Sequence, residues 1–225
     1  MSSLYALVPI KHPVRGKSRL ASVLDEQQRG ALNTLLARRA LEACTRVFGA
    51  QRTLVVTGSP EAAAIAGEFG ISVVPEEPAQ RDVNAAVGAA AEFARRAGAT
   101  AIIVVPTDLP LLADSDLAAA VAAIPTAPGC LLVPDLRGTG TNVIALTPVR
   151  SDLFSFGEPS LERHARQARL LGYQVRIHRS YALELDLDRP EDYDQLRKTK
   201  AWQIFESTIQ KPSAARLDSI PISRG

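Results

Sequence analysis

Residues 104–110, Val-Val-Pro-Thr-Asp-Leu-Pro, decide the fold of this chain. They end an apolar run from Ala101 to Val105, whose Val and Ile content is typical of a strand buried on both faces of a parallel sheet. Pro110 has no N–H to donate to a sheet ladder, so the strand stops before it. Asp108 is thereby predicted at the carboxyl end of a central strand, where open α/β sheets bind their ligands. From this position alone, the carboxylate could equally hold a divalent metal or cap a turn.

Strands and helices alternate along the rest of the chain, a pattern typical of a parallel sheet flanked by helices. Apolar patterning and turn residues predict strands at 4–10, 53–56, 71–74, 101–105, 130–133, 143–146 and 173–179. Helices are predicted at 25–47, 60–69, 83–98, 117–124 and 161–171, and another begins at Pro190. We expect a single α/β domain over residues 1–200, with a Rossmann-like, mostly parallel central sheet. Residues 201–225 are expected to form a tail of low order.

The composition is that of an ordinary globular protein: 46% of the 225 residues are hydrophobic, 22% are charged, and the net charge is +2. This charge gives no reason to expect nucleic-acid binding, and no apolar run is long enough for a membrane span. Cys44 and Cys130 lie far apart without metal-ligand spacing, which favours two buried thiols. The histidines at positions 12, 164 and 178 lack the spacing of a metal site or catalytic triad. We expect a cytoplasmic protein without nucleic-acid or membrane partners, and a homodimer is compatible with the sequence.

A basic loop follows the first predicted strand and carries Lys11, Lys17 and Arg19. Gly16-Lys17-Ser18 is similar to the end of a P-loop, but that motif requires glycine where Lys11 stands, which excludes a Walker A sequence. A cationic loop at this place still suits a polyphosphate, because Lys and Arg neutralise its charge and bond its oxygens. A solvated basic loop is the alternative.

Three further loops carry polar residues that suit an anionic or nucleotide ligand. Asn84 begins an Ala-rich helix, which it could cap, or it could contact a nucleobase or ribose. Thr139 and Thr141 alternate with glycines, so this stretch offers hydroxyl and N–H donors to an anion, unless it is a plain hairpin tip. Gly157 and Ser160 precede a helix, where free N–H groups bind phosphate, although Ser160 could also be a simple N-cap.

Two acids near the end of the predicted domain, Asp186 and Asp188, stand two residues apart. In extended chain such a pair points to the same side. Together with Asp108 they would make an oxygen-rich site for Mg²⁺. Two solvated acids beside a helix cap are the alternative interpretation.

Five short motifs occur in sequence order: PxK at 9–11 with KSRL at 17–20, PTDLP at 106–110, GTGTN at 138–142, FGxxS at 156–160, and LDLDxPED at 185–192. Over about residues 4–197 this set resembles the phospholactate guanylyltransferase family of coenzyme F420 biosynthesis (CofC or FbiD type). The resemblance implies a nucleotidyltransferase fold. It also implies transfer of GMP from GTP to 2-phospho-L-lactate, phosphoenolpyruvate or 3-phospho-D-glycerate, with release of pyrophosphate. The sequence does not choose among these acceptors.

The charges and the resemblance together assign roles to these residues. Lys17, Arg19 and Asp108 are expected to be catalytic, and Lys11, Lys17, Arg19 and Asn84 to bind the nucleotide. Mg²⁺ is expected on Asp108 with Asp186 or Asp188, and the acceptor on Thr139, Thr141, Gly157 and Ser160. The sequence departs from the family pattern at 81–84, where a nucleotide loop containing Gly and Leu is expected, and in the tail after Trp202.

Two other functions compete with this assignment. One is a different nucleotidyltransferase, such as a molybdopterin guanylyltransferase or a sugar-phosphate uridylyltransferase. Those enzymes usually carry a Gly-rich loop after the first strand, where this chain has Pro9-Ile10-Lys11. The other is a nucleotide-binding domain without turnover, which has little need for three carboxylates facing a triphosphate.

Overall fold

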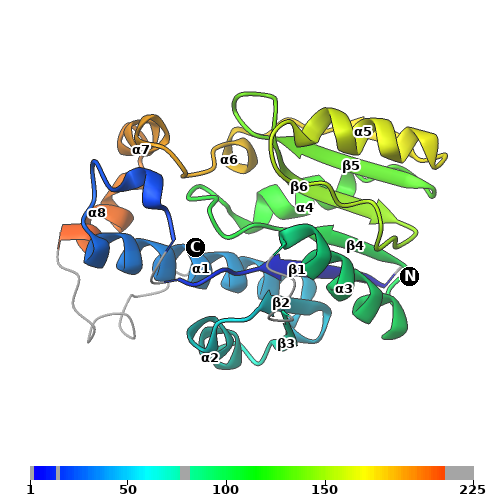
Figure 1. Ribbon diagram of the computed structural model, residues 1–225, viewed down its shortest axis with the longest axis horizontal. Helices are drawn as coiled ribbons and strands as arrows, with labels where there is room; N and C mark the ends of the chain where they lie inside the picture. Colours follow the sequence, from blue (N-terminus) through cyan, green and yellow to red (C-terminus); the bar gives the residue numbers. More distant parts are fainter. Residues whose placement is uncertain (1–2, 14–15, 77–81, 211–225) are drawn as a thin grey trace.

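A sheet of seven strands crosses the protein in the order β3-β2-β1-β4-β6-β5-β7 (Figure 1). The computed structural model describes residues 3–13, 16–76 and 82–210. The strands are β1 Leu4–Pro9, β2 Thr53–Thr57, β3 Ser72–Pro75, β4 Ala101–Val104, β5 Gly129–Pro134, β6 Thr141–Thr147 and β7 Gln174–Ile177. The helices are α1 Glu26–Phe48, α2 Pro60–Glu68, α3 Val83–Arg96, α4 Asp114–Ala122, α5 Ser160–Leu170, α6 Tyr181–Glu184, α7 Pro190–Arg197 and α8 Trp202–Gln210, with short 3₁₀ turns η1 Ser18–Leu20 and η2 Ala50–Arg52. The predicted α/β class is confirmed.

Most neighbouring strands are parallel, and β6 is the exception. It pairs antiparallel with β4 on one side and with β5 on the other. The connection from β5 to β6 spans only residues 135–140, and a link this short can form a hairpin but not the crossover that parallel strands require. The sheet is therefore mixed but mostly parallel.

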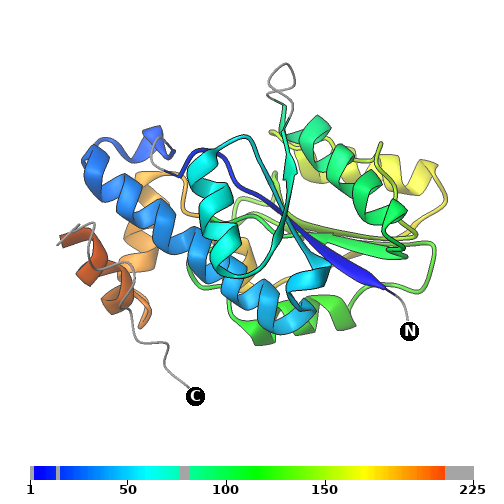
Figure 2. The ribbon, with the colours of Figure 1, turned by 90° about the horizontal axis from the view of Figure 1, so that it is seen from below.

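Helices cover both faces of the sheet, and the two resulting cores are separate clusters (Figure 2). One cluster includes residues of α1, α2 and α4, and the other includes residues of α3 and α5. Along β4, Ile103 belongs to the first cluster, while Ile102 and Val104 belong to the second, as the alternation of side chains in a strand requires. All four residues of β4 are buried, which confirms the prediction of a strand covered on both faces.

Helix α8 corrects the expectation for the C-terminal region. Residues 202–210 were expected in a tail of low order, but they form a helix in which Phe205 and Ile209 are buried. These side chains pack with Leu32 and Leu36 of α1 in a third cluster. The domain therefore extends to residue 210 at least, and the rest of the expected tail, residues 211–225, lies outside the described residues.

Removal of the Phe205 side chain tests how firmly α8 belongs to the domain. Phe205 is fully buried, so Phe205→Ala is expected to lower the free energy of unfolding by about 3–5 kcal/mol. Its neighbour Ile204 is 39% exposed and serves as the control, with an expected change of about 0.5 kcal/mol or less. Urea denaturation followed by circular dichroism measures both. Equal small losses for the two variants would mean that α8 adds nothing to the fold.

Over the ranges that the structure describes, the helices are all too short or too polar to cross a membrane.

Candidate active site

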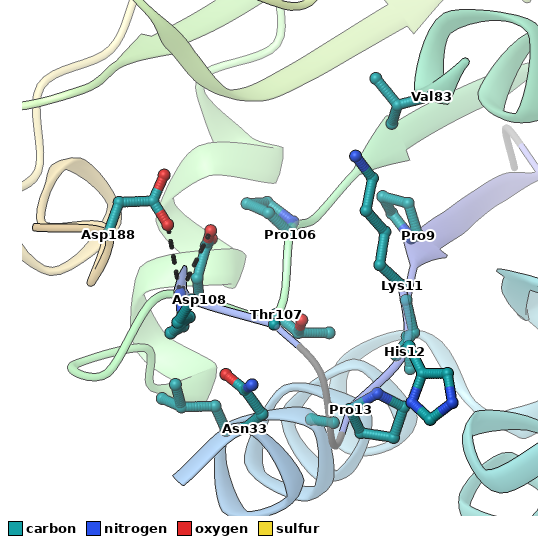
Figure 3. Close-up of a pocket in the computed structure, with 15 residues that line it drawn as sticks. Pro9, Lys11, His12, Pro13, Asn33, Val83, Pro106, Thr107, Asp108 and Asp188 are labelled. Carbon is teal, nitrogen blue, oxygen red and sulfur yellow. Dashed lines mark hydrogen bonds and ion pairs between the residues drawn. The ribbon is translucent and has the colours of Figure 1, made fainter. Parts of the chain in front are cut away.

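A cavity of about 310 Å³ opens beside the carboxyl ends of β1 and β4 (Figure 3). The chain passes from β1 to β2 and β3 on one side and returns to β4 on the other, so this is the point at which strand order reverses and α/β sheets bind ligands. The loops after β1 and β4 and one face of α1 supply most of the lining, together with single residues from α3 and the acidic segment before α7. The lining residues that can bind an anion or a cation are Lys11, His12, Lys17, Asn33, Thr107, Asp108 and Asp188.

The acidic segment between α6 and α7 lies against the loop that carries Asp108. The backbone N–H of Leu187 donates a hydrogen bond of 2.9 Å to the carbonyl oxygen of Asp108, which fixes Asp186 and Asp188 beside it. Burial, together with the negative charges of Asp108 and Asp188, raises the pKa of Asp186 to about 7. Burial also raises the pKa of Asp108, and the charge of Lys17 partly opposes that rise. The structure thus brings the three predicted carboxylates into electrostatic contact.

The Lys17 ammonium group lies between two of these carboxylates. Its Nζ is 3.3 Å from Oδ1 of Asp188 and 3.8 Å from Oδ2 of Asp108 (dashed lines in Figure 3). Within the described ranges, no three His, Cys, Asp or Glu side chains are arranged to hold a metal ion. At the position predicted for the metal, the Lys17 ammonium group lies between Asp108 and Asp188 and neutralises their charges.

The other predicted nucleotide ligands lie in different surroundings. Lys11 lines the cavity, and its amine points toward Val83 (Figure 3). Arg19 is exposed on η1 and lies outside the cavity lining. Asn84 does not cap α3, because Asp82 does so by accepting the Asn84 N–H at 3.1 Å. The Asn84 amide bonds instead to the backbone N–H and carbonyl of Phe156, so it joins α3 to the loop before α5.

The predicted acceptor residues come together at the β5–β6 hairpin and the start of α5. Ser160 is 2% exposed, and its Oγ accepts the backbone N–H of Thr141 at 2.8 Å. Pro159 occupies the N-cap position, so the alternative that Ser160 caps α5 is wrong. The Thr139 carbonyl accepts the N–H of Leu161 at 3.0 Å. Gly157 has φ of 107°, a conformation that favours glycine. These residues form one connected unit, although none of them lines the cavity described above.

Ser160 also holds this unit together. Ser160→Ala would leave the buried Thr141 N–H without its acceptor, an expected loss of about 1–3 kcal/mol in the free energy of unfolding. Ser151→Ala, at an exposed position, is the matched control, with an expected change of about 0.5 kcal/mol or less. Thermal and urea unfolding measure both variants. If Ser160→Ala is no less stable than the control, the hydrogen bond to Thr141 contributes nothing.

His164 belongs to the same unit and is fully buried. Its Nε2 accepts the Ser155 N–H at 2.8 Å, and its Nδ1 lies 3.0 Å from Oγ1 of Thr141. Burial lowers the pKa of His164 to about 4, so the imidazole is neutral at pH 7. With both ring nitrogens engaged, His164 supports the hairpin and is not placed to exchange protons with a ligand.

Several residues of the site were missed by the sequence analysis. Arg137 donates to Oδ1 of Asp192 at 2.8 Å, and Asp192 in turn accepts the backbone N–H of Asp188 at 3.1 Å. Asn142 donates to the carbonyls of two residues in α6, each at 3.0 Å. These bonds tie the β5–β6 hairpin to the acidic segment. Asn142 and Asp192 lie inside the motifs at 138–142 and 185–192, so the sequence could have marked them as site residues. Their hydrogen-bond partners are known only from the fold.

Two polar atoms at the cavity are buried without a hydrogen-bond partner in the described part of the chain: Nδ1 of His12 and Nδ2 of Asn33. Buried polar groups are nearly always hydrogen-bonded in native proteins. These two unpartnered atoms are therefore exceptions to that rule.

Comparison with known proteins agrees with this geometry. Residues 4–197 match the family described as "Guanylyl transferase CofC like". The phosphoenolpyruvate guanylyltransferase of Rubrobacter xylanophilus is 34% identical over 194 residues, which cover 86% of this chain and 93% of that protein. The protein of the same name from Conexibacter woesei is 35% identical over 198 residues, with coverage of 87% and 88%.

Solved structures of other nucleotidyltransferases share the fold at low sequence identity. A cytidylyltransferase from Leptospira borgpetersenii superposes with a TM-score of 0.58 at 16% identity, covering 99% of this chain and 100% of that one. A 4-diphosphocytidyl-2C-methyl-D-erythritol synthase gives 0.55 at 17% identity, covering 94% and 99%. The family match and the two relatives decide the identity: the chain belongs to the CofC-like guanylyl transferase family.

Proposed function

We propose that this protein transfers GMP from GTP to phosphoenolpyruvate, with release of pyrophosphate, in coenzyme F420 biosynthesis. The observation that carries the proposal is the placement of Lys17, Asp108 and Asp188 together at the strand-order reversal of a nucleotidyltransferase fold. The names of the relatives from Rubrobacter and Conexibacter favour phosphoenolpyruvate over 2-phospho-L-lactate and 3-phospho-D-glycerate. GTP and this acid are the partners that the proposal requires.

The carboxylates fit a divalent cation. Burial raises the pKa of Asp186, and the negative charges of Asp108 and Asp188 add to the rise. A cation bound beside these acids would offset their mutual repulsion. Asp108, with Asp186 or Asp188, would hold Mg²⁺, which prefers oxygen ligands. When bound, Mg²⁺ supplies charge neutralisation to phosphate oxygens.

The reaction joins two anions. A phosphate oxygen of the acceptor attacks the α-phosphorus of GTP, a new P–O bond forms, and the bond from the α-phosphorus to the bridging oxygen breaks and leaves pyrophosphate. Charge neutralisation is therefore the main demand on the protein. Lys17 and Lys11 line the cavity and would bind the triphosphate, with Arg19 as a further cation from the same loop. The attacking oxygen is already ionised and needs no general base, which agrees with the engagement of both nitrogens of His164.

The two substrates would bind to two different parts of the protein. The cavity would take the nucleotide. The acceptor would bind near the start of α5, whose N-terminal end carries a partial positive charge. There Thr139, Thr141 and Gly157 would provide backbone and hydroxyl groups, while Ser160 orients Thr141. Asn84 would support the nucleotide through its bridge to Phe156.

The cytoplasm is the compartment that we propose for this reaction, in keeping with two buried, unpaired cysteines, Cys44 and Cys130. A homodimer is compatible with the proposal but not required by it.

A substrate panel tests the proposal. The purified protein is incubated with GTP, Mg²⁺ and each of the three acids, and the products are identified by mass spectrometry. We expect a guanylylated phosphoenolpyruvate as the main product and little reaction when ATP replaces GTP. Equal turnover with ATP would overturn the choice of nucleotide, and exclusive reaction of another acid would overturn the choice of acceptor.

A further inference from the structure

Lys17 occupies an unusual position in the loop after β1. Its side chain is only 9% exposed, and a lysine is almost never buried to this extent unless it has a charged partner. Its backbone is left-handed, with φ of 59° and ψ of 42°, and it is the one non-glycine residue with positive φ in the described part of the chain. A side chain other than glycine rarely adopts this conformation, and such residues concentrate at functional sites. The loop therefore holds this ammonium group at a fixed place.

That place is the one where a divalent cation would be needed. The ammonium is 3.3 Å from a carboxylate oxygen of Asp188 and 3.8 Å from one of Asp108. Both of these carboxylates belong to the proposed Mg²⁺ site. A metal ion that bound the same oxygens would face the positive charge of Lys17 at short range, and like charges repel strongly in a partly buried site. Lys17 and the metal thus exclude one another from these carboxylates.

We infer that Lys17 competes with the divalent cation for Asp108 and Asp188. Its ammonium group neutralises these two carboxylates until the phosphates of a nucleotide attract it away. The inference rests on the proposed function in one respect, the assignment of these carboxylates to a metal. A triphosphate offers Lys17 several oxygens at the moment when the metal is needed on the carboxylates. The nucleotide-free protein consequently binds divalent metal weakly.

Lys11 provides an internal comparison. It lines the same cavity, but its amine points toward Val83, and no ion pair joins it to a carboxylate among residues 3–13, 16–76 and 82–210 (Figure 3). A lysine that only raises the general positive charge of the cavity would affect metal binding as Lys11 does. A direct competitor would have a much larger effect.

The test measures Mn²⁺ binding to the nucleotide-free protein by electron paramagnetic resonance of the free ion. Lys17→Met is expected to bind Mn²⁺ about tenfold more tightly than the wild type, in the usual range for coupled sites. Lys11→Met is expected to stay within about twofold, since its amine faces away from the acids. Lys17→Arg, which restores the positive charge, is expected to bind as weakly as the wild type. Unchanged or weaker binding by Lys17→Met would overturn the inference.

Two further variants keep the test decisive. Lys17→Gln replaces Lys17→Met if the latter does not fold, as judged by circular dichroism. Adding Asp108→Asn to the Lys17 variant is expected to abolish the gain, and a gain that persists would mean that the metal binds elsewhere and would overturn the inference. None of these measurements requires GMP transfer. An inactive protein with a tenfold gain would therefore refute the proposed function alone, whereas an active protein without the gain would refute only the role of Lys17.

Discussion

Asp108→Asn is expected to lower kcat by about a hundred- to a thousandfold, the usual effect of removing one stabilising group from a charged transition state. Asparagine keeps the shape of the side chain, and the carbonyl oxygen that accepts the Leu187 N–H is unaffected. The loss would come from the missing charge, which the site needs in order to hold a cation beside the phosphates. Pyrophosphate release from GTP and phosphoenolpyruvate measures it.

Folding and chemistry can be separated in this variant. Asp108 repels the neighbouring Asp186, whose pKa it helps to raise. Removing the charge of Asp108 is therefore expected to leave Tm unchanged or to raise it. Asp152→Asn is the matched control, because this carboxylate is 60% exposed and pairs with Arg150 outside the cavity. Near-normal turnover in Asp108→Asn would remove Asp108 from the catalytic machinery.

Lys17→Met is the second variant with a large expected effect, a fall of about a hundredfold in kcat/KM for GTP. Methionine keeps the unbranched apolar stem of lysine but has no charge to neutralise the triphosphate or the departing pyrophosphate. Arg19→Met is expected to lose less, because Arg19 is exposed and lies outside the cavity lining. Steady-state kinetics with varied GTP would measure both. A larger loss for Arg19→Met would mean that η1 moves when GTP binds and that the cavity described here is not the complete nucleotide site.

Much of the fold could be predicted because it depends on local patterns. The run that forms β4 is apolar throughout, and Asp25, which caps α1, has a suitable partner in Gln28 three residues later. Strand direction is not encoded in such patterns, so the antiparallel β6 was present only as one alternative, a hairpin tip at Thr139 and Thr141. The short connection at 135–140 was the signal that could have identified it.

Helix α8 was missed for a different reason. Its apolar residues Trp202, Phe205 and Ile209 have helical spacing, but polar residues separate them, and the helix is short. Such a segment gains most of its stability from tertiary packing, here against α1.

The site was predictable in its residue types but not in its contacts. The position of Asp108 after a buried strand and the pair Asp186 and Asp188 were visible in the sequence. The ion pair between Lys17 and Asp188 joins residues 171 positions apart, and no local rule predicts such a contact. The same is true of Ser160, which was expected to face a ligand and instead accepts the Thr141 N–H.

The most direct test of GMP transfer by this protein is ³¹P nuclear magnetic resonance of one reaction mixture. The purified protein is combined with GTP, phosphoenolpyruvate and Mg²⁺, and the phosphorus signals are followed over time. We expect the three GTP signals to decline together while inorganic pyrophosphate and a pair of coupled signals from a new P–O–P linkage appear in equal amounts. Intact GTP, or release of orthophosphate without the new linkage, would contradict GMP transfer by this protein.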